Sequence, residues 1–86
     1  MRFRLSNHAR AEMARRRITQ RHVISVLDNP EQVVPGYGGR KVYQSQVDFG
    51  DSGRFLLRVI VDDRVDPPVV VTVYRTSKTG KYWRAE

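Results

Sequence analysis

Apolar residues recur at two different spacings along the chain, and the spacing changes near position 31. The first segment, RFRL at 2–5, alternates polar and apolar residues over a short length, which is typical of an edge strand. Ser6 then offers a helix N-cap, and Ala9 and Met13 share one helix face through their i,i+4 spacing. The pattern predicts a short strand followed by a helix over NHARAEMARRR, residues 7–17.

A second helix is predicted directly after the first. Thr19 is a favourable N-cap, and Ile18 before it can pack on Val23 as a hydrophobic staple. Pro30 cannot continue a helix, because it has no amide hydrogen and its ring clashes with the preceding turn. The buried stripe of this helix is predicted to be Val23, Val26 and Leu27. Together the two helices form a predicted helical hairpin.

From position 31 onward, β-branched and aromatic residues predominate and turn sequences interrupt them. The turns are PGYGG at 35–39, GDSG at 50–53 and DDRVDPP at 62–68. They separate predicted strands near QVV, RKVYQSQVDF, RFLLRVIV and VVVTVYRT. Because short turns favour antiparallel neighbours, the predicted order is βααββββ.

Side-chain alternation assigns the faces of the predicted sheet. One row of RFLLRVIV is wholly apolar and should face the helices: Phe55, Leu57, Val59 and Val61. The same reasoning directs three valines of the last strand to the helices: Val69, Val71 and Val73. Arg58, Thr72 and Tyr74 are then expected on the open face. Tyr43 is assigned to neither face, because a bulge in its strand would reverse the alternation.

The fold class that follows is α+β, a two-layer sandwich with the helical hairpin packed on one face of a mainly antiparallel sheet. The 86 residues are enough for one domain, 1–86. With no cysteine and only His8 and His22, the chain lacks the residues for thiolate chemistry or a usual zinc site, and we expect neither metal nor cofactor. The start of the chain is charged and lacks a long apolar run, so we expect a cytoplasmic protein without a membrane segment.

Charge is the strongest compositional signal. Sixteen Lys and Arg against nine Asp and Glu leave a formal net charge of +7. An excess of this size on a small domain attracts polyanions through counterion release, so nucleic acid is the expected partner. A solubilising basic surface, or a patch that docks an acidic protein, explains the composition equally well.

Several strings of this sequence resemble a small bacterial domain family of unknown function, family 4258. They are LSNHARAEMARRRITQRHVISVLDNP, GRKVY, LLRVIV and VVTVYRTSKTGKYW, and they run over nearly the whole chain. That family is similar in fold to the RelE and BrnT type toxins, small basic ribonucleases of bacterial toxin–antitoxin systems. The resemblance implies a RelE-like fold and RNA handling by basic and tyrosine side chains of the sheet and C-terminal segment. Fold similarity does not establish activity.

Metal-independent RNA cleavage needs a proton acceptor, a proton donor and cations that stabilise the phosphorane. Arg58 can grip two phosphate oxygens, and Tyr74 can donate a proton or stack on a base. The alternative is that the two are a cross-strand pair that covers an open sheet face. The cations expected to bind flanking phosphates are Arg40, Lys41, Arg75, Lys78 and Lys81. The segment 75–81 is expected to edge the same concavity as Arg58 and Tyr74.

His8 is the candidate general base, and we expect it to approach Arg58 and Tyr74, because the short first strand delivers the start of its helix to one end of the sheet. It lies in the first turn of a helix, where the helix dipole favours the neutral imidazole. The alternative is a structural histidine bonded to a neighbouring strand. His22 is expected to be a solvated residue of the second helix.

Two further groups have a structural and a functional interpretation. Arginines 15–17 can interact with the helix dipole or contact phosphate. Tyr82 and Trp83 can pack as a lid over the edge of the core or stack on bases. We expect the dipole interpretation for the three arginines and the packing interpretation for Tyr82 and Trp83.

Two functions therefore remain open. The first is a toxin-like RNA-binding protein, a metal-independent ribonuclease of a toxin–antitoxin system that acts on ribosome-associated messenger RNA and pairs with an acidic antitoxin. The second is a non-catalytic module that binds RNA or an acidic partner protein. Residues alone do not separate the two.

Overall fold

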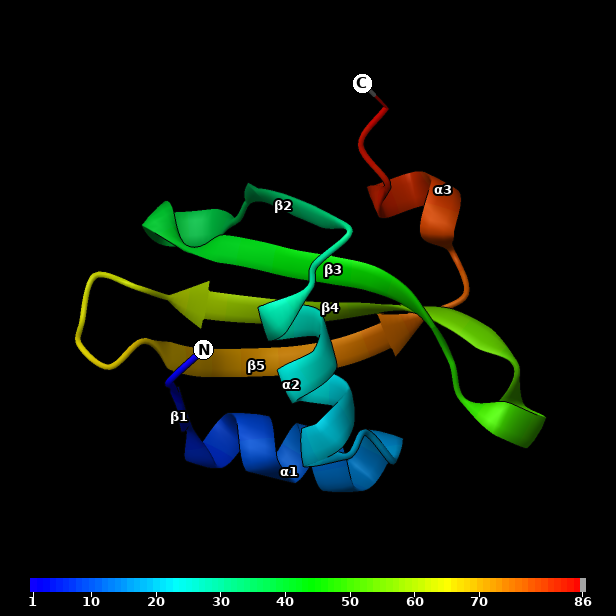
Figure 1. The fold of residues 1–86 in the computed structure, drawn as a ribbon, viewed down its shortest axis with the longest axis horizontal. Coiled ribbons are helices and arrows are strands. Elements are labelled where there is room, and N and C mark those ends of the chain that lie inside the picture. The colour runs from blue at the N-terminus through cyan, green and yellow to red at the C-terminus, as the bar shows by residue number, and fades with distance from the viewer. Residues whose placement is uncertain (86) are drawn as a thin grey trace.

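Five strands form one open sheet in the computed structural model, which describes residues 1–85 (Figure 1). Their spatial order is β1-β5-β4-β3-β2, and all neighbours are antiparallel except β1, which runs parallel to β5. The mainly antiparallel α+β sheet agrees with the sequence-based prediction. The strands are β1 (Arg4–Leu5), β2 (Gln32–Pro35), β3 (Lys41–Asp48), β4 (Arg54–Asp62) and β5 (Val69–Thr76).

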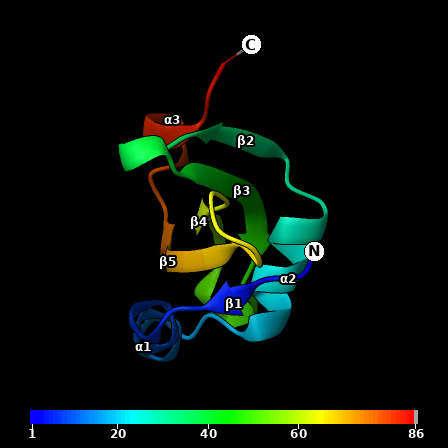
Figure 2. The same ribbon diagram turned by 90° about the vertical axis from the view of Figure 1, so that its left-hand side faces the viewer.

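The two predicted helices are present as α1 (Asn7–Arg16) and α2 (Gln20–Asp28). Ser6 caps α1, because its hydroxyl oxygen accepts a 2.9 Å hydrogen bond from the Ala9 amide. Thr19 caps α2 in the same way through the amide of His22. Both helices pack on one face of the sheet, as predicted (Figure 2).

The core lies between this hairpin and β3–β5. Leu57, Val59 and Val61 of β4 are fully buried against the helices, as the alternation predicted, while Phe55 is only half-buried. Tyr43, which the sequence left unassigned, packs against the same cluster. The buried cluster consists of Ala9, Met13, Ile18, Val23, Val26, Leu27, Leu57, Val59, Val61, Val70 and Val73.

The predictions for Val69 and Val71 are wrong, because β5 contains a bulge and neither residue belongs to the core cluster. Val73 pairs with Val59, but Val61 pairs with Val70, so Val71 is an extra residue between them. The extra residue reverses the alternation, and Val70 takes the core position expected for Val71. The Ser6 hydroxyl donates a 2.8 Å hydrogen bond to the Val71 carbonyl, so the cap of α1 also satisfies the bulged backbone.

The sequence predicted an open sheet face opposite the hairpin, but this face is partly covered. A short third helix, α3 (Thr79–Tyr82), turns back after β5 and lies on that side of the sheet, away from α1 and α2 (Figure 2). Its last residue, Tyr82, accepts a 3.2 Å hydrogen bond at its backbone carbonyl from the buried Gln44 of β3. Part of the predicted open face is therefore covered.

Candidate functional site

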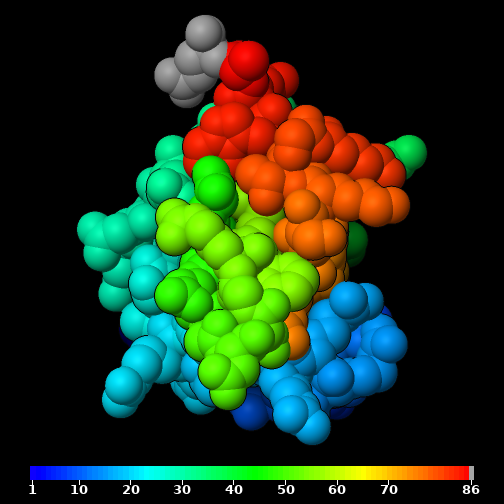
Figure 3. All heavy atoms as spheres, turned by 90° about the vertical axis from the view of Figure 1, so that its right-hand side faces the viewer, coloured from blue at the N-terminus to red at the C-terminus, as the bar shows by residue number. Residues whose placement is uncertain are grey.

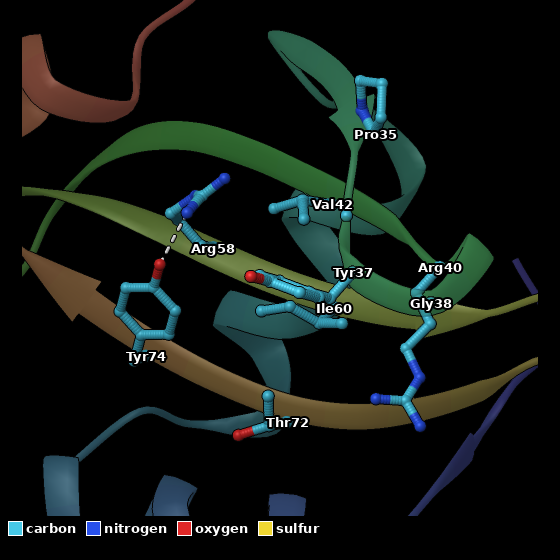
Figure 4. Close-up of a pocket in the computed structure, with 10 residues that line it drawn as sticks. Pro35, Tyr37, Gly38, Arg40, Val42, Arg58, Ile60, Thr72 and Tyr74 are labelled. Atoms are coloured by element: carbon cyan, nitrogen blue, oxygen red, sulfur yellow. Dashed lines mark hydrogen bonds between the residues drawn. The ribbon is translucent and has the colours of Figure 1, made fainter.

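Arg58 and Tyr74 form the centre of the candidate site. They are paired residues of β4 and β5 on the face opposite the hairpin. The Nη1 of Arg58 donates a 2.6 Å hydrogen bond to the Tyr74 hydroxyl oxygen (Figure 4). The predicted position of these two residues, together on that face, is confirmed. Their geometry is also that of a cross-strand pair, so geometry alone assigns no chemical role.

A buried glutamine, Gln44 of β3, fixes the orientation of the Arg58 guanidinium. Its Oε1 accepts a 2.8 Å hydrogen bond from Arg58 Nε, and its Nε2 donates at 2.8 Å to Gln32 Oε1. The Gln44 side chain is 0% exposed, so the amide has few alternative arrangements. Gln44 was not among the site residues predicted from the sequence. The only feature that could have identified Gln44 is its position opposite Arg58, and this position is known only once the register of β3 and β4 is known.

Tyr82 of α3 completes the surroundings of Arg58. Its ring centroid is 4.4 Å from the guanidinium carbon, and its ring is 6.1 Å from that of Tyr74 in an edge-to-face arrangement. Gln32 holds the backbone that follows α3. Its Nε2 donates a 2.6 Å hydrogen bond to the Arg84 carbonyl, and its Oε1 accepts a 3.1 Å hydrogen bond from the Arg84 amide. Tyr82 therefore packs onto the sheet, as the packing interpretation expected, but it covers Arg58 and not the edge of the core.

Beside the Arg58–Tyr74 pair lies a cavity of about 630 Å³. Its sides combine apolar residues of β3 and β4, Val42 and Ile60, with the polar groups of the pair (Figure 4). We call it the Arg58 cavity. It is lined by Pro35, Gly36, Tyr37, Gly38, Arg40, Val42, Arg58, Ile60, Thr72 and Tyr74.

A glycine-rich turn places Tyr37 at the border of this cavity. Gly38 and Gly39 adopt φ values of 64° and 79°, which other residues adopt at a cost. The turn is closed by a 2.8 Å hydrogen bond from the Gly36 amide to the Arg40 carbonyl. Tyr37 is 96% exposed, so its ring has almost no contact with the rest of the chain. The segment was predicted only as a turn, and Tyr37 was not among the predicted site residues.

Of the two cations predicted at the start of β3, the structure places one at the cavity. Arg40 lines the Arg58 cavity, and its Nε is buried without a hydrogen-bond partner among residues 1–85. Lys41 is not among the lining residues. Its Nζ forms a 2.7 Å ion pair with Asp63, and this hydrogen bond raises the pKa of Lys41.

The prediction that Arg75 borders the same cavity is wrong. Arg75 follows Tyr74 in β5 and pairs with Leu57, so its side chain points to the hairpin face. There its guanidinium carbon is 4.4 Å and 4.8 Å from the ring centroids of Phe49 and Phe55. Lys78 and Lys81 are exposed around α3 and do not line the cavity.

His8 does not join the site. It is exposed in the first turn of α1, which belongs to the hairpin layer, and it does not line the Arg58 cavity. The expected approach of His8 to Arg58 and Tyr74 is therefore not seen. The short β1 pairs only with Val69 and Val70, so α1 begins at the opposite end of β5 from Tyr74.

His22 has a structural role that the sequence did not predict. Its Nδ1 accepts a 3.1 Å hydrogen bond from the Thr19 amide and so completes a capping box at the start of α2. Its ring lies 4.5 Å from that of Phe49. Partial burial, and then the nearby charge of Arg75, lower the pKa of His22 below its usual value.

Two kinds of site are absent from residues 1–85. Their His, Asp and Glu side chains form no group of three that could hold a metal ion. None of their helices combines the length and the apolar character needed to cross a bilayer.

Together the fold and the cavity define a small basic α+β domain with an arginine–tyrosine pair on the sheet face opposite its helical hairpin. The chain belongs to the family described as Domain of unknown function (DUF4258), whose model matches residues 5–75. The match includes Arg58 and Tyr74 and ends before Tyr82. A search of curated proteins found no match, and a search of solved structures also found none. The likeness to RelE and BrnT type toxins therefore stays a sequence-based expectation.

Proposed function

We propose that this chain is a toxin-like RNA-binding protein and that the Arg58 cavity holds a nucleotide of single-stranded RNA. One observation carries the proposal. The Arg58 guanidinium is held in place by three groups that are all neutral, the Gln44 amide, the Tyr74 hydroxyl and the Tyr82 ring. No carboxylate among residues 1–85 forms an ion pair with it. Its charge is therefore fixed in position and free to bind an anion.

The other residues of the cavity suit the rest of a nucleotide. Arg40 supplies a second positive charge, and no Asp or Glu lines the cavity to oppose a phosphate. Val42 and Ile60 offer an apolar surface, and the exposed ring of Tyr37 can stack on a base. The volume of about 630 Å³ lies within the range of small-molecule sites.

A metal-independent ribonuclease is the second candidate. Tyr74 favours it, because its oxygen already accepts a hydrogen bond from Arg58 and its own proton remains available for donation. The lining residues supply no His, Asp or Glu as a general base, and His8 lies in the other layer. Binding therefore explains the cavity more completely than cleavage does. Cleavage of ribosome-associated messenger RNA would need the missing proton acceptor from the ribosome or from the RNA itself.

The partner class can be tested by fluorescence anisotropy with a labelled single-stranded RNA at increasing salt concentration. We expect binding at low salt that weakens steeply as salt rises. Arg58→Gln removes the charge but keeps a polar side chain, and we expect it to weaken binding at least tenfold. Arg10→Ala is the matched control, because it removes one charge from an exposed position of α1 outside the cavity.

Absence of RNA binding at low salt, or equal affinity of the Arg58→Gln and Arg10→Ala variants, would contradict the proposal. An acidic protein bound at Arg58 in place of RNA would support the non-catalytic alternative. Growth arrest on expression, relieved by a neighbouring gene that encodes an acidic protein, would support the toxin–antitoxin interpretation and an acidic antitoxin as partner. Growth without arrest would count against the toxin–antitoxin interpretation. RNA binding would then be decided by the anisotropy measurement alone.

A further inference from the structure

A second group of arginines lies on the hairpin face of the sheet, where α1 ends beside β5. Arg15, Arg16 and Arg17 come from the end of α1, and Arg75 from the end of β5. With Phe55 they line a cavity of about 310 Å³, which we call the Arg17 cavity. Figure 3 shows this side of the molecule, with the end of α1 in blue below the end of β5 in orange. The Arg58 cavity does not share any of these residues.

Arg17 has an unusual backbone conformation. It is the C-cap of α1, with φ 55° and ψ 45°, and among residues 1–85 it is the only non-glycine residue with positive φ. Glycine is the usual residue at a left-handed helix end, because a Cβ is strained there. Residues held in such conformations are concentrated at functional sites. An arginine at this position is conformationally strained, but it places a positive charge at the border of the cavity.

The charges of the cluster are only partly balanced. Glu12 pairs with Arg15 through hydrogen bonds of 2.8 Å and 2.9 Å and lies 3.7 Å from Arg16. Arg17 and Arg75 form no ion pair with a carboxylate among residues 1–85. Two guanidinium groups at this cavity are therefore available for an anion.

Arg75 is also held in position. Its guanidinium carbon lies over the rings of Phe49 and Phe55, at 4.4 Å and 4.8 Å from their centroids. Such stacking occupies the flat face of the guanidinium and leaves the N–H groups at its edge free to bind oxygen. The geometry suits a small oxyanion, since planar guanidinium groups match phosphate oxygens in pairs.

We propose that Arg17 and Arg75 form a second binding site, for a backbone phosphate of the same RNA strand that occupies the Arg58 cavity. The RNA part of this inference rests on the proposed function, whereas the anion site can be tested by itself. Tyr74 and Arg75 are successive residues of β5, and their side chains leave the sheet on opposite faces. The outer neighbour of β5, β1, pairs only with Val69 and Val70, so an RNA strand that crosses the sheet edge near Arg75 can contact both sites. A phosphate is favoured over an acidic peptide, because the free groups are two arginines at a small cavity and the phenylalanine rings are already covered by Arg75.

The RNA contact can be measured with the substitution Arg17→Gly and the control Arg10→Ala. Both remove one positive charge, and glycine fits the left-handed conformation, so the fold of the Arg17→Gly variant should be kept. For a single-stranded RNA of about ten nucleotides, we expect Arg17→Gly to lower the affinity severalfold and to reduce the slope of log K against log salt by about 0.7, the value for one phosphate contact. Equal affinity and slope for the two variants would overturn the proposal.

The anion site has an independent readout. Titration of the isotope-labelled protein with inorganic phosphate should shift the NMR signals of Arg17 and Arg75, and should do so equally in the Arg58→Gln variant. Absence of these shifts would overturn the site. If phosphate shifts them but RNA does not bind, the anion site stands, while its RNA ligand and the proposed function fail together. If polyglutamate binds at Arg17 more tightly than RNA does, an acidic protein replaces RNA as the ligand.

Discussion

The guanidinium of Arg58 donates a 2.6 Å hydrogen bond to the hydroxyl oxygen of Tyr74, its partner on the neighbouring strand. Because the Tyr74 oxygen accepts this bond, the hydroxyl proton of Tyr74 remains available to another acceptor. The pair is therefore both a structural link between β4 and β5 and a polarised donor beside a cavity. Substitutions can separate these two roles.

Tyr74→Phe tests the hydroxyl alone. Arg58 is only half-buried, so water can replace the lost hydrogen bond, and we expect the free energy of unfolding to change by less than about 1 kcal/mol. If the chain cleaves RNA, the loss of a transition-state contact should lower cleavage well over tenfold, or about 2 kcal/mol. Urea unfolding and a single-turnover cleavage assay measure the two effects. Full cleavage by the variant would remove Tyr74 from the mechanism.

Gln44→Leu tests the support of the site. Its amide is 0% exposed and makes hydrogen bonds to Arg58, Gln32 and the Tyr82 carbonyl, so its removal leaves buried polar groups without partners. We expect the free energy of unfolding to fall by about 1–3 kcal/mol. Hydrogen exchange of the Trp83 amide, which bonds to Thr79 within α3, should become faster.

Gln46→Leu is the matched control for this substitution. Gln46 lies on the same strand, is partly exposed, and makes its one hydrogen bond outside the sheet ladder through its backbone. Its replacement should change stability by about 0.5 kcal/mol or less. Equal effects of the two substitutions would show that the Gln44 network does not stabilise the fold.

Val73→Ala and Val71→Ala test the bulge in β5. Val73 is 0% exposed in the core, and its truncation removes two methyl groups and leaves a cavity, so we expect a loss of about 1.5–2.5 kcal/mol. Val71 is the extra residue outside the core cluster, and its truncation should cost less than about 1 kcal/mol. Thermal or urea unfolding compares the two. A larger loss at Val71 would contradict the observed register.

Acid pH should destabilise the chain through His22. The folded state lowers the pKa of His22 from its usual 6.5, because the ring is partly buried and lies near the positive charge of Arg75. The unfolded chain therefore binds more protons than the folded chain just below pH 6.5. Stability is fully present above this pH and is lost as the pH falls below it.

His22→Gln isolates this effect, because glutamine keeps a capping side chain without titrating. Urea unfolding at pH 7 and pH 5.5 should show a decline for the original chain and a smaller one for the variant. The carboxyl of Asp62, whose pKa is lowered to about 2 by hydrogen bonds from Arg64, titrates well below this range. Equal declines in both proteins would assign the pH dependence to another group.

The family match and the sheet are consistent with what local patterns predicted. The capped hairpin, the buried stripe of α2 and the apolar row of β4 depend on periodicity and capping within a few residues, so the sequence predicted them correctly. The position of Arg58 opposite Tyr74 also follows from alternation along two strands joined by one turn.

The wrong predictions concern Val69 and Val71, then Arg75, and then His8, and these three errors have separate causes. The bulge at Val71 shifts the alternation of β5, and no local sequence pattern predicts this bulge. Arg75 was predicted at the wrong face because it was grouped with the C-terminal cations instead of being assigned by its own place in the alternation. His8 was expected near the site from the position of β1 alone, although α1 runs along the hairpin layer.

By itself the sequence determined the α+β class, the helical hairpin, the basic charge and the pairing of Arg58 with Tyr74, because each depends on local spacing or on composition. Only the tertiary structure decided that Gln44 holds Arg58, that α3 places Tyr82 over it, and that Arg17 meets Arg75. These contacts join residues that are distant along the chain. Strand register and the return of the C-terminal segment bring them together, and no periodicity in the sequence encodes such a meeting.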